Sequence, residues 1–208
     1  MIFSRLLLEV FLLLKYEADN TTYLVRGCVR DTLMFKIPKD YDIVTDVPMS
    51  TIKTIFLNNN WKVSDTGKTF FVLNVSKEGK NYEIANFRKD IGIADGRRPE
   101  KCEIGDMSTD SQRRDFTINS IYYDPMNDKF YDPVGGLKDL NSRILKFIGK
   151  PSERIREDYL RVFRFYRFIT KGFTPDKKSL KACRALFTEA YTNTTPERVR
   201  MELEKIAI

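Results

Sequence analysis

Strand and helix patterns alternate along the first 148 residues, whereas only helical patterns follow residue 150, so the chain is limited to a mixed α/β unit followed by a helical one. The strand-like runs are short and alternating or rich in β-branched and aromatic side chains, and they lie at residues 23–26, 40–46, 69–75 and 82–87. Residues 77–80 predict a hairpin turn, and the polar segment 90–106 predicts a mobile loop. The helical patterns lie at residues 49–59, 152–171, 176–191 and 196–208.

No histidine occurs among the 208 residues, which excludes several kinds of chemistry. Ser-His-Asp triads, Cys-His pairs, His-ligated zinc and histidine acid–base catalysis are all ruled out. Any catalysis by this chain must therefore use carboxylates, metal ions, Lys, Arg or backbone groups.

The chain carries a positive charge that is concentrated in its helical part. Lys and Arg number 36 against 29 Asp and Glu, a formal net charge of +7. Residues 151–208 hold 13 Lys and Arg and only 8 Asp and Glu. This excess favours a polyanionic partner such as nucleic acid or phosphate, and a basic surface without a ligand is the alternative.

The N-terminus and the cysteines indicate a cytoplasmic protein. Residues 1–14 are apolar enough to resemble a signal sequence, but Glu9 interrupts them and they are too short to span a bilayer. Their apolar residues recur at helical spacing, which predicts a buried amphipathic helix: Leu6, Leu7, Val10, Phe11 and Leu14. Cys28, Cys102 and Cys183 form no CxxC pair, so a reducing compartment without disulfides is expected.

The segment KDYDIV at 39–44 is the main metal-site candidate. Side chains on a strand alternate between its faces, so Asp40 and Asp42 are expected on the same side. Two carboxylates at such a short distance repel each other unless a cation lies between them. Mg²⁺ prefers oxygen ligands, including those of phosphates. Glu83, on an expected neighbouring strand, is the candidate third carboxylate. The alternative is a solvated strand end.

The segment RGCVRD at 26–31 follows an expected strand and is expected to open a helix. Gly27 would let backbone N–H groups approach phosphates, the helix N-terminus would favour negative charge, and Arg30 could hold a phosphate bidentately. A plain strand-to-helix turn with a surface pair between Arg30 and Asp31 is the alternative.

Three further segments complete an ordered set, RRDFTIN at 113–119, DPVGGLKDL at 132–140 and EDYLR at 157–161. In this order the five segments resemble the class II tRNA nucleotidyltransferase and bacterial poly(A) polymerase family, of the DNA polymerase β superfamily. The likeness runs from about residue 7 to the end. It implies an α+β fold with a nucleotidyltransferase (DNA polymerase β-like) head that has a small mixed sheet (1–148), followed by an all-helical neck (149–208). Gly135 and Gly136 match the hinge of the family between head and neck.

The resemblance also implies roles for individual residues. Asp40 and Asp42 would bind catalytic Mg²⁺ ions with Glu83 nearby, and Gly27 and Arg30 would hold the triphosphate. Arg114, Asp115 and Asn119 would contact the ribose. Asp158 and Arg161 would contact the base, and Arg164 and Arg167 would contact the nucleotide phosphates.

Two pairs among these residues have spacings that place them on one face of a helix. Asp115 and Asn119 are four apart, and Asp158 and Arg161 are three apart. An Asp acceptor and an Arg donor fork could pair with the edge of cytosine or adenine, so the protein itself would act as the template. A solvated basic helix face is the alternative for the arginines.

The chain departs from the family pattern at several places. Arg26 stands where the family has the first of two glycines, and it would either crowd the turn or add a phosphate contact. Ser111 replaces a leucine. Family members continue into further helical domains that grip tRNA, so this chain is either a fragment or a reduced version that binds RNA with the neck alone or as an oligomer.

The resemblance implies a template-independent RNA nucleotidyltransferase. An RNA 3′-hydroxyl would attack the α-phosphate of CTP or ATP with Mg²⁺, and CCA addition to tRNA 3′ ends is the expected outcome. CC-only, A-only or poly(A) addition is the alternative within the family, and a non-catalytic RNA-binding module is the alternative from another class. The partners would be a tRNA or other RNA 3′ end, without a membrane.

Overall fold

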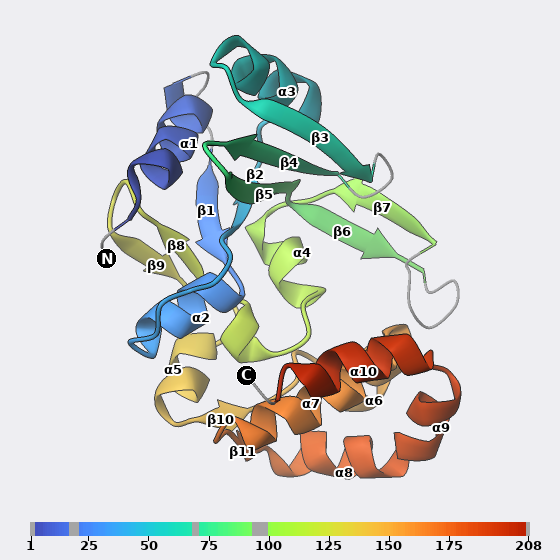
Figure 1. Ribbon diagram of the computed structural model, residues 1–208. Helices are drawn as coiled ribbons and strands as arrows, with labels where there is room; N and C mark the ends of the chain where they lie inside the picture. Colours follow the sequence, from blue (N-terminus) through green and yellow to red (C-terminus); the bar gives the residue numbers. More distant parts are fainter. Residues whose placement is uncertain (1–2, 17–20, 68–70, 93–99, 207–208) are drawn as a thin grey trace. The chain divides into compact units, whose positions relative to one another are not determined.

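The computed structural model describes residues 3–16, 21–67, 71–92 and 100–206 (Figure 1). Packing divides the chain into two compact units. Unit 1 comprises Met1–Lys89, Cys102–Asp110 and Asn119–Pro133, and unit 2 comprises Asp90–Lys101, Ser111–Ile118 and Val134–Ile208. The chain therefore passes between the units several times. The boundary at residues 148 and 149 concerns functional domains and stays a prediction.

A seven-stranded mixed sheet forms the centre of unit 1, which confirms the predicted fold class. Its strand order is β3-β4-β5-β2-β1-β8-β9 (Figure 1). Only β2 and β5 pair in parallel, and the other neighbours are antiparallel. The strands are β1 (Thr22–Val25), β2 (Asp42–Thr45), β3 (Lys62–Gly67), β4 (Val72–Lys77), β5 (Lys80–Asn86), β8 (Tyr122–Asp124) and β9 (Lys129–Tyr131).

The predicted hairpin between the strand-like runs is confirmed. Glu78 and Gly79 connect β4 to β5, and both have positive φ, 51° and 73°. A two-residue turn with both φ positive matches the twist of the paired strands. The turn therefore fixes the register of β4 against β5, and β5 pairs with β2 along its other edge.

Three of the described helices lie wholly within unit 1: α1 (Arg5–Tyr16), α2 (Gly27–Leu33) and α3 (Met49–Asn58). The five apolar residues of α1 predicted to be buried are each at most 6% exposed, which confirms the amphipathic helix. Glu9 lies on its polar side and accepts hydrogen bonds from Lys77 and Trp61. Among the described helices, none combines the length and apolar character needed to cross a membrane.

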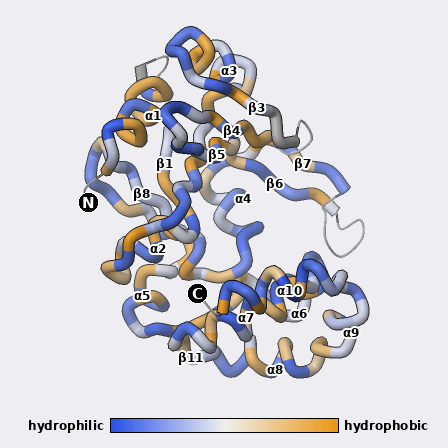
Figure 2. Tube along the Cα trace, viewed as in Figure 1, coloured by the Kyte–Doolittle hydropathy of each residue, from blue (hydrophilic) through white to orange (hydrophobic). Residues whose placement is uncertain are grey.

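The segment predicted as a mobile loop at 90–106 is partly strand, so that prediction was wrong at both ends. β6 (Arg88–Ile91) and β7 (Lys101–Ile104) form a two-stranded sheet, and α4 (Met107–Gln112) follows. β6 is largely hydrophilic (Figure 2), so hydropathy gave no strand signal there, and the alternation of polar and apolar residues in β7 spans only four positions. Residues 93–99 of this segment lie outside the described residues.

Unit 2 is mainly helical. Its elements from residue 134 onward are α5 (Gly136–Asn141), β10 (Ile144–Leu145), α6 (Pro151–Glu157), α7 (Leu160–Thr170), β11 (Thr174–Pro175), α8 (Lys177–Ala185), α9 (Phe187–Thr192) and α10 (Pro196–Glu204). A short parallel pair joins β10, which lies within the predicted head range, to the two-residue strand β11 in the otherwise helical segment after residue 149. The single helices predicted at 152–171 and 176–191 are each two helices, and a 3₁₀ turn lies at Thr117–Asn119.

Buried aromatic rings form the core of unit 2. Phe116, Phe147 and Phe165 are at most 1% exposed, and their ring centroids lie 4.8 to 6.2 Å apart. Phe168 packs on Phe116 at 5.5 Å. Burial of such rings contributes about 1.5–3 kcal/mol each, so this core holds the segment around residue 116 against the helices that follow.

Candidate functional site

Asp42 and Glu83 form the carboxylate pair of unit 1. They are register partners on the parallel strands β2 and β5, as the sequence predicted. The next residues of β2 are buried, whereas the side chains of Asp42 and Glu83 are 29% and 43% exposed. Two partly solvated carboxylates therefore lie side by side at the start of β2.

Asp40 lies outside the strand, so the predicted alternation from Asp40 to Asp42 was wrong. β2 begins only at Asp42, and the preceding residues form a bend. The pleat of the strand therefore does not set the direction of the Asp40 side chain, which is exposed. Its assignment as a metal ligand stays a prediction.

The turn from β1 into α2 has the predicted location but an unusual conformation. β1 ends at Val25 and α2 begins at Gly27. Between them Arg26 has φ 68° and ψ −133°, a combination that glycine adopts readily and other residues adopt at a cost of about 1–3 kcal/mol. Arg26 Nη1 lies 3.3 Å from Asp42 Oδ1 and 3.5 Å from Glu83 Oε1. The sequence marked Arg26 as a departure but gave no sign that it pairs with the carboxylates.

Arg30 contacts two side chains in unit 1. Its Nη1 donates to Asn119 Oδ1 at 2.5 Å, while Nε and Nη2 donate to Asp31 Oδ1 at 3.0 and 2.7 Å. The pair between Arg30 and Asp31 is therefore present, as expected if the segment is a plain strand-to-helix turn. The side chain of Arg30 is 15% exposed, so these contacts fix its direction.

The predicted helix carrying Asp115 and Asn119 does not exist. Asp115 precedes an isolated bridge at Phe116, and Asn119 ends a three-residue 3₁₀ turn. Asp115 Oδ1 accepts from the Phe116 amide at 2.7 Å, and its Oδ2 lies 3.4 Å from Arg164. Asp115 belongs to unit 2 and Asn119 to unit 1. Their i,i+4 spacing therefore did not predict a shared helix face correctly.

The segment around Arg114 is held by Arg154, a residue that the sequence analysis missed. Arg114 is 6% exposed. Arg154 Nη2 donates to the carbonyl oxygens of Arg113 and Arg114, and its Nη1 pairs with Glu157. Burial lowers the pKa of Arg154, as does the nearby charge of Arg161. The spacing of Arg154, Glu157 and Arg161 along a helical pattern was the available signal.

Asp158 and Arg161 do not share a helix face, which corrects that prediction. Asp158 lies after α6 with extended backbone (φ −153°, ψ 103°), and α7 begins at Leu160. Asp158 Oδ1 accepts from the Leu160 amide at 3.2 Å and from Arg198 Nη2 at 3.0 Å. Arg161 donates to Glu157 and to the carbonyl oxygens of Arg154 and Arg113.

Arg164 and Arg167 both contact a buried carboxylate of α10. Arg167 Nε donates to Glu202 Oε2 at 2.6 Å, and Arg164 Nε lies 3.5 Å from Oε1. Burial alone would raise the pKa of Glu202, but Arg167 and Arg164 outweigh it and lower the pKa. Burial would lower the pKa of Arg164, but Asp115 and Glu202 raise it. The basic stripe on α7 is therefore largely neutralised.

The donor set of unit 1 suits a divalent cation that is shared with phosphates. Within the described residues, no group of three or more Cys, Asp or Glu side chains is arranged to hold a metal by itself. Mg²⁺ commonly takes only one or two carboxylates and completes its shell with water and substrate phosphates. Asp42 and Glu83 meet that requirement, and the Gly27 turn follows the strand beside β2.

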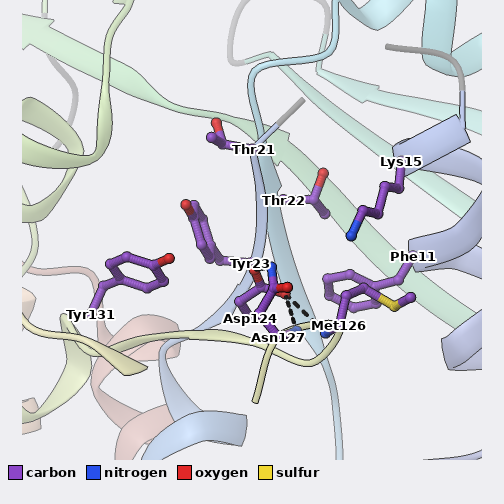
Figure 3. Close-up of a pocket in the computed structure, with 9 residues that line it drawn as sticks. All are labelled: Phe11, Lys15, Thr21, Thr22, Tyr23, Asp124, Met126, Asn127 and Tyr131. Carbon is purple, nitrogen blue, oxygen red and sulfur yellow. Dashed lines mark hydrogen bonds between the residues drawn. The ribbon is translucent and has the colours of Figure 1, made fainter. Parts of the chain in front are cut away.

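A hollow lies at the opposite end of β1 from the Gly27 turn (Figure 3), where the strand begins at Thr22. It has a volume of about 200 Å³ between α1, β1 and the β8–β9 turn. In that turn Asp124 accepts hydrogen bonds from the Met126 and Asn127 amides. None of the predicted site residues lines it.

A mixed sheet that carries adjacent carboxylates beside a strand–Gly–helix turn defines the nucleotidyltransferase class of head domain. A family model described as the Poly A polymerase head domain matches residues 22–146. The chain belongs to this family, whose members are nucleotidyltransferases that generally depend on divalent metals.

Known proteins agree with this assignment. The chain is 38% identical over 194 residues to a CCA-adding enzyme of Limosilactobacillus reuteri, and 33% identical over 192 residues to that of Bacillus subtilis. These matches cover 92% and 91% of this chain and 47% of each relative, so the chain spans about half the length of the curated relatives it matches.

Two solved structures have the same fold. The Bacillus stearothermophilus CCA-adding enzyme in complex with CTP aligns with a TM-score of 0.81 and 30% identity, covering 96% of this chain and 47% of that one. The Thermotoga maritima CCA-adding enzyme complexed with tRNA_CCA aligns with a TM-score of 0.79 over 99% of this chain and 48% of that one. Its 24% identity supports the fold alone.

Proposed function

We propose that the chain provides the head and neck of a tRNA nucleotidyltransferase that adds CMP and AMP from CTP and ATP to complete CCA 3′ ends. One observation carries the proposal, namely the side-by-side position of Asp42 and Glu83 on β2 and β5 in a chain of this family. The CTP complex of a 30% identical relative supports nucleotide binding. The three cysteines, none of them in a disulfide, support a cytoplasmic location.

Asp40 and Asp42 would hold Mg²⁺, with Glu83 beside them. Bound Mg²⁺ would polarise the α-phosphate and stabilise the pyrophosphate that leaves. The side chains and backbone of the protein bind and orient the nucleotide. Arg30 and the turn at Gly27 hold the triphosphate, and Arg30 stays aligned because Asn119 and Asp31 accept its hydrogen bonds. No histidine is needed for this chemistry, in agreement with the composition.

The residues predicted to contact the base and the ribose would select the nucleotide. Asp158 offers an acceptor and Arg161 a donor fork for the base edge, while Asp115 with Asn119 would contact the ribose. Arg114 would join them, and Arg164 and Arg167 would approach the phosphates. The ion pairs of Asp158 with Arg198 and of Arg164 with Asp115 support defined directions for these side chains.

The test is extension of a tRNA that lacks its 3′ terminus, with Mg²⁺ and labelled CTP and ATP. The expected product is a tail of two C residues and one A. A tail of C alone, of A alone or of many A residues would replace the proposed product by one of the related activities. Binding of the tRNA without any extension would instead favour an RNA-binding module.

The Asp42→Ala variant tests the carboxylate pair. It should lose at least about a thousandfold in kcat and retain its tRNA affinity, because Asp42 acts on the reacting phosphate rather than on RNA. Asp46→Ala is the matched control, since Asp46 follows the other end of β2 and binds Thr21. An Asp42→Ala enzyme as active as the Asp46→Ala control would refute the assignment.

A further inference from the structure

The side chain of Arg26 lies on the same carboxylates that the proposed function assigns to a divalent cation. Its Nη1 is 3.3 Å from Asp42 Oδ1 and 3.5 Å from Glu83 Oε1, so one guanidinium group bridges the two strands. All three side chains are partly exposed, between 29% and 43%, which leaves room for a cation and its water to approach. Arg26 is thus a positive charge already placed at the carboxylate pair.

The backbone at Arg26 indicates that this placement is built in. With φ 68° and ψ −133°, the residue adopts a conformation that suits glycine and not a residue with a Cβ. A side chain at such a position persists where surrounding contacts hold it. The side chain of Arg26 forms two ion pairs and no cap on α2, while its carbonyl oxygen accepts a hydrogen bond from the Arg30 amide at 3.1 Å.

A divalent cation and this guanidinium group compete for the negative charge of Asp42. A Mg²⁺ ion would sit about 2.1 Å from a carboxylate oxygen, and so within a few ångströms of Nη1. Like charges at that separation repel, and Arg26 also reduces the negative charge that attracts the ion. The cation must therefore displace Arg26 or bind more weakly beside it.

We propose that Arg26 is an internal competitor of the divalent cation for Asp42 and Glu83, which weakens cation binding to the nucleotide-free protein. The inference rests on the proposed function, because it takes the carboxylate pair as the cation site. A triphosphate offers the displaced guanidinium group new oxygen acceptors, so cation binding would become favourable mainly together with the nucleotide.

The test is the affinity of the full chain for Mn²⁺ alone, measured from the free-ion electron paramagnetic resonance signal without nucleotide. Arg26→Gln and Arg26→Ala should each bind Mn²⁺ about tenfold more tightly than the unmodified chain, since both remove the competing charge. Arg26→Lys keeps that charge and should stay within about threefold of the unmodified chain. Arg26→Gly relieves the backbone as well and should bind as tightly as Arg26→Ala.

Asp42→Asn separates the failure of this inference from failure of the proposed function. If Asp42→Asn abolishes Mn²⁺ binding but Arg26→Gln and Arg26→Ala bind no more tightly than the unmodified chain, the competitor role is wrong and the cation site stands. If Mn²⁺ binding is absent even in Arg26→Gln and Arg26→Ala, or is indifferent to Asp42→Asn in every Arg26 background, the competitor role is overturned, whereas the proposed function is decided separately by the tRNA extension assay. Weaker binding in Arg26→Ala would also overturn the inference, because Arg26 would then order the carboxylates. Thermal unfolding without metal confirms that each variant is folded.

Discussion

Arg30 and Asn119 are joined by a 2.5 Å hydrogen bond from Nη1 to Oδ1 across 89 positions of the chain. Arg30 belongs to α2, which follows the Gly27 turn, and Asn119 ends the 3₁₀ turn. Each was assigned to the nucleotide for a different reason, the first to phosphate and the second to ribose. Their contact indicates that the two side chains act together.

The first prediction concerns this pair. Arg30→Ala and Asn119→Ala should each raise KM for CTP, and the double variant should raise it by less than the product of the two effects. The expected coupling is about 1 kcal/mol, because either change removes the same hydrogen bond. Steady-state kinetics of the four proteins measure it, and strictly multiplicative effects would show that the two residues act separately.

The second prediction concerns nucleotide choice. Asp158→Ala should reduce the preference for CTP and ATP over UTP and GTP by at least about tenfold, because the acceptor for the base edge is lost. Arg198→Ala is the matched control, since it removes the partner of Asp158 at 3.0 Å and keeps the carboxylate. The ratios of kcat/KM for the four nucleotides provide the measurement. An unchanged ratio in Asp158→Ala would mean that Asp158 only joins α6 to α10.

Stability should depend strongly on Arg154. Replacement by alanine removes the donor to the Arg113 and Arg114 carbonyl oxygens and the partner of Glu157, at a cost of about 2–4 kcal/mol. Urea unfolding followed by circular dichroism measures the change. Lys150→Ala, which breaks an exposed pair with Glu153, is the control and should cost less than about 1 kcal/mol. Equal losses in the two variants would contradict the prediction.

Acid should weaken the helical unit through Glu202. Its pKa is lowered from 4.5 by Arg167 and Arg164 against the opposing effect of burial, so its ionised form favours the folded state. That stabilisation is complete above pH 4.5 and is lost as the pH falls through the lower pKa of the folded protein.

Glu202→Gln should therefore show a flatter dependence of unfolding free energy on pH over the acid range below 4.5. Urea midpoints at neutral and acid pH compare it with the unmodified chain. Glu204→Gln, at an exposed pair with Arg200, serves as the control and should follow the unmodified chain. Parallel curves for Glu202→Gln and the unmodified chain would assign the acid sensitivity to other carboxylates.

Local patterns in the sequence predicted the elements in which burial of one face sets the spacing of the apolar residues, and the turns between them. The apolar spacing in α1 and the turn at Glu78 and Gly79 reflect contacts within or next to the element itself. The strand pattern at Glu83 also correctly predicted a strand next to the one that carries Asp42.

The errors arose where distant residues decide the local conformation. Asp158 interrupts the predicted helix because its carboxylate binds Leu160 and Arg198, the latter 40 positions away. Asp115 lies in no helix, since its segment bridges to Phe147 and is held by Arg154 from α6. Periodicity carries no information about such contacts. The same holds for Arg26, whose partners come from β2 and β5.

The two guanidinium groups that share Glu202 have a consequence for shortened forms of this chain. Trimming between α7 and α10 would remove Glu202, which would leave Arg167 without this carboxylate and Arg164 with only Asp115 as its acidic partner. Such a product would bind polyanions without specificity during purification. Its high affinity for nucleic acid would then reflect the loss of a neutralising carboxylate and would not be evidence of specific recognition.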